Sequence, residues 1–120
     1  MQYAHARICS VFRQLTERGI DIDFREADSS QLIEDQELAL LRSLSRYPEV
    51  VAQAARNYEP HQVAYFAREL ANEFHTYYNA LPFISAEEHL RLARLSLIDA
   101  TRQVLANALR LLGVTAPQSM

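Results

Sequence analysis

The chain has 120 residues, of which 49% are hydrophobic and 22% are charged, and its net charge is -3. This length is typical of one domain over residues 1–120, and the composition excludes a disordered chain. The slight acidic excess argues against a protein that binds nucleic acid by bulk positive charge. Two Gly and four Pro are too few for a turn-rich all-β fold.

The single Cys9 excludes an internal disulfide and favours a reducing compartment, so we expect a cytoplasmic protein. No apolar run approaches the ~18 residues of a membrane-spanning helix. The first 13 residues are polar and charged, which does not fit a signal peptide.

Helical periodicity dominates the first part of the chain. Residues 1–18 predict a helix that ends at Gly19, a residue suited to the left-handed conformation at a helix end. Residues 20–30 alternate apolar and polar side chains, but no second alternating run could pair with them, so we expect an extended surface loop held to the protein by its apolar side chains. A short helix follows over residues 31–46. The apolar side chains expected to face the core from these two helices are Ile8, Val11, Phe12, Leu15, Leu38, Leu41 and Leu44.

Two prolines stand where first-turn prolines belong. Pro48 is expected to begin a short helix that ends near residue 57, and Pro60 another that runs to residue 81, before Pro82. The second helix carries a regular apolar stripe at spacings of three and four residues. Its members are Val63, Phe66, Ala67, Leu70, Phe74, Tyr77 and Leu81.

The longest predicted helix covers residues 86–112. Ser85 and Glu88 have the spacing of a capping box before it, and Gly113 follows it. The side chains expected on its apolar face are Leu90, Ala93, Leu97, Ala100, Val104, Ala108 and Leu111. The sequence therefore predicts an all-α fold, a bundle of about five helices whose last two form an antiparallel pair.

The sequence offers no convincing catalytic or metal site. His5 and Cys9 lie four residues apart, so both could touch one metal ion, but two ligands do not complete a zinc site. The helical neighbours Ile8 and Phe12 indicate that Cys9 is a buried, unreactive thiol. No two glycines lie close enough to form a phosphate-binding loop. We predict no catalytic residue and no metal ligand.

Tyrosine and arginine provide the remaining signal. Tyr77 and Tyr78 point about 100° apart on one helix, so Tyr77 is expected in the core and Tyr78 towards solvent. Tyr3 and Arg7 share a helix face because they are four residues apart. His75 lies one turn from Tyr78, which suits either a polar patch or a solvated helix surface. Exposed tyrosine beside arginine is typical of sites that stack RNA bases, although tyrosines at the margin of a core would give the same pattern.

Two stretches, one at each end of the chain, carry a family resemblance. They are QYAHAR at residues 2–7 and ATRQVLANALRLLGVTAPQSM at residues 100–120. They resemble the C-terminal anticodon-binding domain of arginyl-tRNA synthetases, the DALR-type helix bundle, and the resemblance extends over essentially the whole chain. Asn107-Ala108-Leu109-Arg110 stands where the motif that names the domain has Asp-Ala-Leu-Arg.

The resemblance implies an RNA-binding role for specific residues. Tyr3 and Arg7 match the family's anticodon-loop contacts at the start of the bundle. Tyr78 matches a tyrosine that lies against the splayed anticodon bases, and Met120 matches a C-terminal methionine of the same pocket. The implied partner is the anticodon loop of arginine-accepting tRNA.

The family's catalytic signatures are absent, so we expect this chain to be a fragment without the catalytic domain. In the family, that separate domain uses ATP, with Mg²⁺ expected, to attach arginine. The catalytic domain of the parent synthetase is therefore a second expected partner, and the fragment itself is expected to need no cofactor. The alternative is a helical protein-interaction bundle without RNA binding, whose tyrosines are structural.

Overall fold

The computed structural model describes residues 1–81, 83 and 86–113. These residues form four α-helices, α1 (Gln2–Glu17), α2 (Asp35–Arg56), α3 (His61–Ala80) and α4 (Glu88–Leu111). Two short 3₁₀ turns, η1 (Phe24–Glu26) and η2 (Ser29–Gln31), lie between α1 and α2. The predicted all-α bundle is confirmed, with four helices in the described ranges in place of about five.

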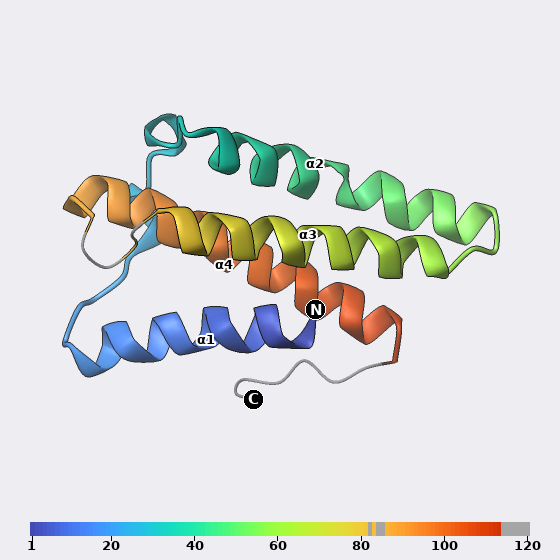
Figure 1. Cartoon of the computed structure of the whole chain (residues 1–120), viewed down its shortest axis with the longest axis horizontal. Helices are drawn as coiled ribbons and strands as arrows, with labels where there is room; N and C mark the ends of the chain where they lie inside the picture. Colours follow the sequence, from blue (N-terminus) through green and yellow to red (C-terminus); the bar gives the residue numbers. More distant parts are fainter. Residues whose placement is uncertain (82, 84–85, 114–120) are drawn as a thin grey trace.

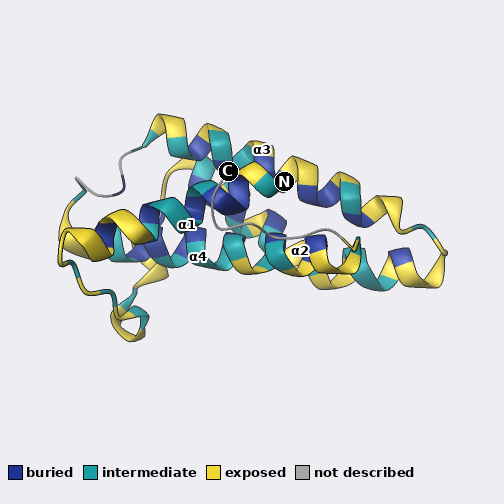
Figure 2. Ribbon diagram, turned by 90° about the horizontal axis from the view of Figure 1, so that it is seen from below, coloured by how far each residue is buried: buried dark blue, intermediate teal, exposed yellow. Residues whose placement is uncertain are grey.

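The helices pack as a bundle with a central pair. Figure 1 shows α1 and α2 on opposite sides of α3 and α4, and these neighbouring helices are in contact. The buried side of each helix faces this shared interior, while the turn between α2 and α3 is largely exposed (Figure 2). Within the part of the chain that the structure describes, no helix is both long and apolar enough to cross a membrane.

The prediction of two helices around Pro48 was wrong, because α2 continues through this residue. A proline inside a helix leaves the carbonyl group four residues earlier, here that of Leu44, without its backbone donor. Pro48 is exposed, so water can reach this part of the helix. Tyr47 packs its ring against Phe66 of α3 at 5.5 Å between centroids, and this contact holds the two halves of α2 against the same neighbour.

The predicted faces of α2 and α4 were partly wrong. In α2, Leu38 is 40% exposed, whereas Glu37 and Leu40 are fully buried. In α4, Leu111 is 60% exposed, whereas Leu105 is fully buried. Each of these helices packs against more than one neighbour, so the buried strip is wider than a single stripe and includes polar residues that a hydrophobicity pattern assigns to solvent.

Several helix ends agree with the sequence and two differ. α2 begins at Asp35, four residues later than predicted, because the chain forms the separate η2 turn up to Gln31. Gly19 and Gly113 both have positive φ, 71° and 75°, as expected for residues that end helices. α4 begins at Glu88, two residues later than predicted, and its N-cap is Glu87, whose carboxylate accepts hydrogen bonds from the backbone N–H groups of His89 and Leu90. The predicted cap Ser85 lies outside the described residues.

The loop between α1 and α2 is held by its apolar side chains, as predicted. Ile20, Ile22 and Phe24 are half-buried against the core, and Phe24 meets the Phe12 ring of α1 edge to face. Asp23 caps the η1 turn by accepting a hydrogen bond from the backbone N–H of Arg25. This segment therefore closes one end of the bundle between α1 and α4.

Candidate nucleic-acid interface

Four side chains from two helices meet at the surface between α1 and α3. The guanidinium carbon of Arg7 lies 4.3 Å from the centroid of the Tyr78 ring and 5.3 Å from that of Tyr3. The Tyr3 ring lies 5.4 Å from the ring of His75 and is inclined to it by 32°. We call Tyr3, Arg7, His75 and Tyr78 the aromatic–arginine cluster. Three of the four predicted RNA-binding residues are therefore brought together by the fold.

Helical spacing explains how each half of the cluster forms. Tyr3 and Arg7 lie one turn apart on α1, and His75 and Tyr78 lie one turn apart on α3. On each helix the adjacent positions are in the core. These neighbours are all fully buried, and they are Ala4 and Ile8 on α1, and Phe74 and Tyr77 on α3. Packing of these neighbours fixes the direction in which the cluster faces.

The members of the cluster differ in exposure. Tyr3 is 53% exposed, whereas Arg7, His75 and Tyr78 are half-buried. The Tyr78 ring stacks on Phe83 at 5.8 Å, with an interplanar angle of 28°. Tyr78 is thus held between neighbours and is less open than predicted, while Tyr3 offers more ring surface to an incoming base.

His75 connects the two helices by a polar contact. Its Nδ1 lies 3.2 Å from Nη1 of Arg7. A guanidinium group can only donate, so Nδ1 is the acceptor and the imidazole is neutral with its proton on Nε2. Burial, together with the positive charges of Arg7 and the amino group of Met1, lowers the pKa of His75 below its usual value. The one-turn spacing of His75 from Tyr78 is visible in the sequence, but its position beside Arg7 is not.

Met120, the fourth predicted RNA-binding residue, lies outside the described residues. The RNA-binding roles of Tyr3, Arg7, Tyr78 and Met120 stay predictions. Phe83 was not considered in the sequence, because it lies in a short connection after α3 where no periodicity marks it.

A buried polar network joins α2, α3 and α4 in the core. Glu37 of α2 accepts a 2.9 Å hydrogen bond from Nε of Arg94 and a 2.6 Å hydrogen bond from the hydroxyl of Tyr77, both at Oε2. Glu37 and Tyr77 are fully buried and Arg94 is 5% exposed. Burial and the Glu37 carboxylate raise the pKa of Tyr77 far above its usual value, so the hydroxyl keeps its proton and donates.

The motif that matches the domain's name serves packing. Ala108 and Leu109 are buried in the interface of α4 with the bundle. Arg110 Nη2 donates a 2.8 Å hydrogen bond to Oδ1 of Asn107, one turn earlier. Asn107 supplies the acceptor oxygen at this position, so the replacement of Asp by Asn retains this contact.

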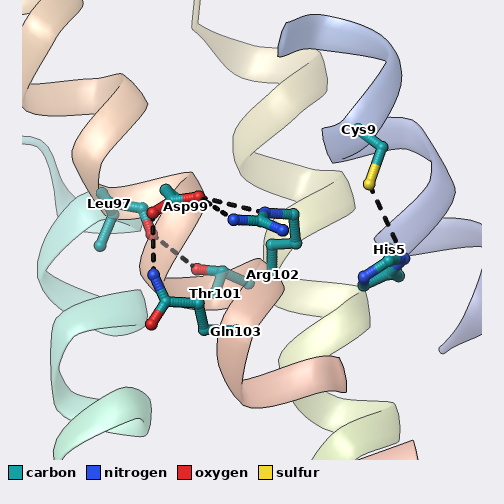
Figure 3. Close-up of polar contacts among 7 residues, drawn as sticks. All are labelled: His5, Cys9, Leu97, Asp99, Thr101, Arg102 and Gln103. Carbon is teal, nitrogen blue, oxygen red and sulfur yellow. Dashed lines mark hydrogen bonds and ion pairs between the residues drawn. The ribbon is translucent and has the colours of Figure 1, made fainter. Parts of the chain in front are cut away.

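His5 and Cys9 are close, but they do not form a metal site with a third ligand. The Cys9 Sγ lies 3.9 Å from Nδ1 of His5 (Figure 3). Among the described residues, no three His, Cys, Asp or Glu side chains are grouped so that they could hold a metal ion. Cys9 is half-buried rather than buried as predicted, because it lines an open groove with Phe12 and Arg102.

Two arginines, Arg13 and Arg102, line that groove, and Arg102 is ion-paired. Arg102 of α4 donates to Oδ1 of Asp99, and Gln103 donates a 2.9 Å hydrogen bond to Oδ2 of the same carboxylate (Figure 3). Arg102 is therefore engaged by a carboxylate one turn earlier on its own helix.

The fold and the cluster define an all-α bundle domain that carries an aromatic–arginine surface between α1 and α3. The chain belongs to the DALR anticodon binding domain family, whose model matches residues 1–120. The resemblance noted in the sequence is thereby confirmed.

Relatives of the chain are similar to it over almost its whole length. The arginine–tRNA ligase of Halorhodospira halophila is 63% identical over 99% of this chain, which corresponds to 21% of that relative. The arginine–tRNA ligase of Thioalkalivibrio sulfidiphilus is 56% identical over 100% of this chain and 21% of its own length. The chain therefore spans about a fifth of the length of these curated relatives.

Solved structures show the same fold. The Thermus thermophilus arginyl-tRNA synthetase matches with a TM-score of 0.86 and 35% identity, over 99% of this chain and 20% of that one. The Plasmodium falciparum arginyl-tRNA synthetase matches with a TM-score of 0.79 at 22% identity, over 98% of this chain and 20% of that one, a likeness of fold alone.

Proposed function

We propose that this chain binds the anticodon loop of arginine-accepting tRNA as one part of an arginine–tRNA ligase. The observation that carries the proposal is the convergence of Tyr3 and Arg7 from α1 with Tyr78 from α3. Tyr78 is far from Tyr3 and Arg7 in the sequence, and the family resemblance assigns all three to contacts with the anticodon loop. The family membership and the identities of the relatives support the proposal.

The cluster can bind splayed RNA bases by two physical effects. The exposed ring of Tyr3 offers a surface on which a base can stack, a contact worth ~1–3 kcal/mol per base. The guanidinium of Arg7 supplies hydrogen-bond donors and positive charge for a phosphate or a base edge. Tyr78 and Phe83 pack behind it, so Arg7 is presented on a rigid support.

The net charge of -3 fits a module that reads a loop without supplying the main electrostatic affinity. In the parent protein, other domains can contact the tRNA body, and the two contacts then reinforce each other through effective concentration. The isolated chain is accordingly expected to bind weakly and with strong salt dependence. Saturable binding as tight as that of a complete synthetase at physiological salt would contradict this expectation.

We assign the chemistry of aminoacylation, and the ATP and Mg²⁺ it requires, to the catalytic domain of the parent and not to this chain. The two glycines of the chain, Gly19 and Gly113, each follow the end of a helix and form no phosphate-binding loop. We therefore propose that this chain needs no cofactor of its own. The parent is proposed to act in the cytoplasm, where its tRNA substrate would be used for protein synthesis.

A titration tests the proposal. The fluorescence anisotropy of an RNA hairpin that carries an arginine anticodon is measured against this chain at low salt, beside a hairpin with the middle anticodon base changed. Preference for the arginine hairpin is the expected result. If neither hairpin binds, the same pair is tested with a longer chain that includes the catalytic domain, and absence of binding there too would favour the protein-interaction bundle and overturn the proposal.

A further inference from the structure

His75 is the member of the aromatic–arginine cluster to which the family resemblance assigns no role. It lies on α3, one turn before Tyr78, and its ring is half-buried against Tyr3 of α1. The core side of this turn is already filled by Phe74, which is fully buried. The imidazole is therefore placed at the surface of the bundle, where it touches the predicted RNA-binding residues.

The contact of His75 with Arg7 has a defined polarity. Nη1 of Arg7 donates to Nδ1 of His75 at 3.2 Å, and the Arg7 guanidinium carbon lies 4.3 Å from the Tyr78 centroid. These two contacts approach the guanidinium from α3 and restrict it to one place beside Tyr3. An arginine side chain that is held before binding loses less conformational entropy when the ligand arrives.

We infer that His75 is a positioning residue for RNA binding, whose neutral imidazole accepts a hydrogen bond from Arg7 and holds its guanidinium between the Tyr3 and Tyr78 rings. This inference rests on the proposed function. In this role His75 positions Arg7, and His75 itself need not contact RNA.

The charges around His75 agree with an acceptor role. The polar and charged groups that face it are Arg7, Tyr3 and the amino group of Met1, all from the α1 side. None of these supplies a negative charge at neutral pH. Burial and the two positive charges lower the pKa of His75, so the neutral form is maintained at pH 7.

Substitutions can separate the acceptor from the ring. His75→Asn places an amide oxygen near the position of Nδ1 and keeps the acceptor, whereas His75→Phe keeps a ring against Tyr3 and removes the acceptor. RNA affinity for the arginine-anticodon hairpin is measured for both. His75→Phe is expected to weaken binding roughly tenfold, which corresponds to the loss of one hydrogen bond to a charged group. The affinity of His75→Asn is expected to stay within about threefold of that of the wild type.

A double-mutant cycle with Arg7 tests whether His75 acts through this residue. In the Arg7→Met background, His75→Phe is expected to have no further effect on RNA affinity. The free protein is also examined by ¹⁵N NMR, where Nδ1 of His75 is expected to carry no proton at pH 7. Circular dichroism confirms that each variant is folded at the temperature of the titration.

The outcomes distinguish this inference from the proposed function. An equal loss of affinity from His75→Phe with and without Arg7 overturns the positioning role, and so does a proton on Nδ1. Wild-type affinity in His75→Phe overturns it as well, while RNA binding by the wild type leaves the proposed function standing. Failure of the wild type to bind the hairpin, alone and with the catalytic domain, overturns both.

Discussion

The hydroxyl of Tyr77 donates a 2.6 Å hydrogen bond to the carboxylate of Glu37, which joins α3 to α2 inside the core. The same carboxylate oxygen accepts from Arg94, so α4 is joined at the same point. Tyr77 is thereby fixed towards the interior. Its neighbour Tyr78 points about 100° away around the helix, to the side where Arg7 of α1 packs on it. The buried network and the surface cluster thus depend on one orientation of α3.

Removal of one partner of the buried ion pair should destabilise the domain strongly. Arg94→Met leaves the Glu37 charge without its cation in the core, and a cost of ~3–5 kcal/mol is expected for an uncompensated buried charge. The measurement is the free energy of unfolding by urea denaturation. The combined change Glu37→Met and Arg94→Met should be less destabilising than the sum of the two single changes, because no unpaired charge then remains.

The matched control for this prediction is an exposed ion pair. Arg25 and Asp23 form a 2.8 Å ion pair in the loop, with side chains that are 89% and 53% exposed. Arg25→Ala should leave the urea midpoint unchanged within error, since water screens exposed pairs. An effect of Arg94→Met no larger than that of Arg25→Ala would show that the buried network does not stabilise the fold.

The two adjacent tyrosines should separate stability from RNA binding. Tyr78→Ala should weaken binding of the arginine-anticodon hairpin by about 5- to 150-fold, the equivalent of ~1–3 kcal/mol of stacking, and Tyr78→Phe should retain most of the affinity. Tyr77→Phe should lower stability by ~1–3 kcal/mol, because Glu37 loses a donor in the core. Its RNA affinity should be unchanged under conditions in which the protein is folded.

These variants are compared by anisotropy titration and by urea denaturation. If Tyr78→Ala unfolds the chain, the contacts of this ring with Phe74 and Phe83 are structural and the stacking role is wrong. Tyr3→Ala then provides an independent test, because its ring is 53% exposed. It should weaken RNA binding with little change in the urea midpoint.

Deletion of Ser119 and Met120 should weaken RNA binding and leave helicity intact. The family resemblance places Met120 in the pocket for the anticodon bases, and the four described helices end at or before Leu111. Hairpin affinity and the circular dichroism signal are measured for the shortened chain and for a Met120→Leu variant. Leucine keeps most of the apolar surface, so it should bind better than the deletion. Equal affinity in the wild type and the deletion would exclude a role for this end in binding.

The start of α4 should contribute a pH-dependent term to stability through Glu87. Hydrogen bonds from the backbone N–H groups of His89 and Leu90 lower the pKa of Glu87 below its usual value of 4.5. The carboxylate is thus favoured in the folded state, and its stabilising contribution is present above pH 4.5 and is lost as the pH falls through the lower folded-state pKa.

Glu87→Gln tests this sign. The wild type is expected to be more stable than Glu87→Gln at pH 7, and this difference in stability should shrink as the pH falls below 4.5. Urea midpoints at a series of pH values provide the measurement, with Glu88→Gln as the neighbouring control because Glu88 is the first residue of α4 and not its N-cap. A difference that grows on acidification would contradict the capping role.

The sequence by itself determined the helical class and most helix ends, because these depend on local chemistry. Apolar spacing on α3 correctly predicted the burial of Val63 and Phe74, and Gly19 correctly predicted the end of α1. Local rules failed where packing opposed them. Pro48 stays inside α2 because its exposed position lets water solvate the helix there and the Tyr47–Phe66 contact holds it on α3.

Tertiary structure decided which residues meet across helices. The sequence shows that Tyr3 and Arg7 are one helical turn apart. It does not show that His75 and Tyr78 of α3 contact Arg7. Likewise, no local pattern marks Glu37 and Arg94 as core residues, since isolated charges favour water and become buried only when an opposite partner arrives from another helix. Periodicity reports one helix at a time, whereas a binding site and a buried ion pair are properties of the contact between two.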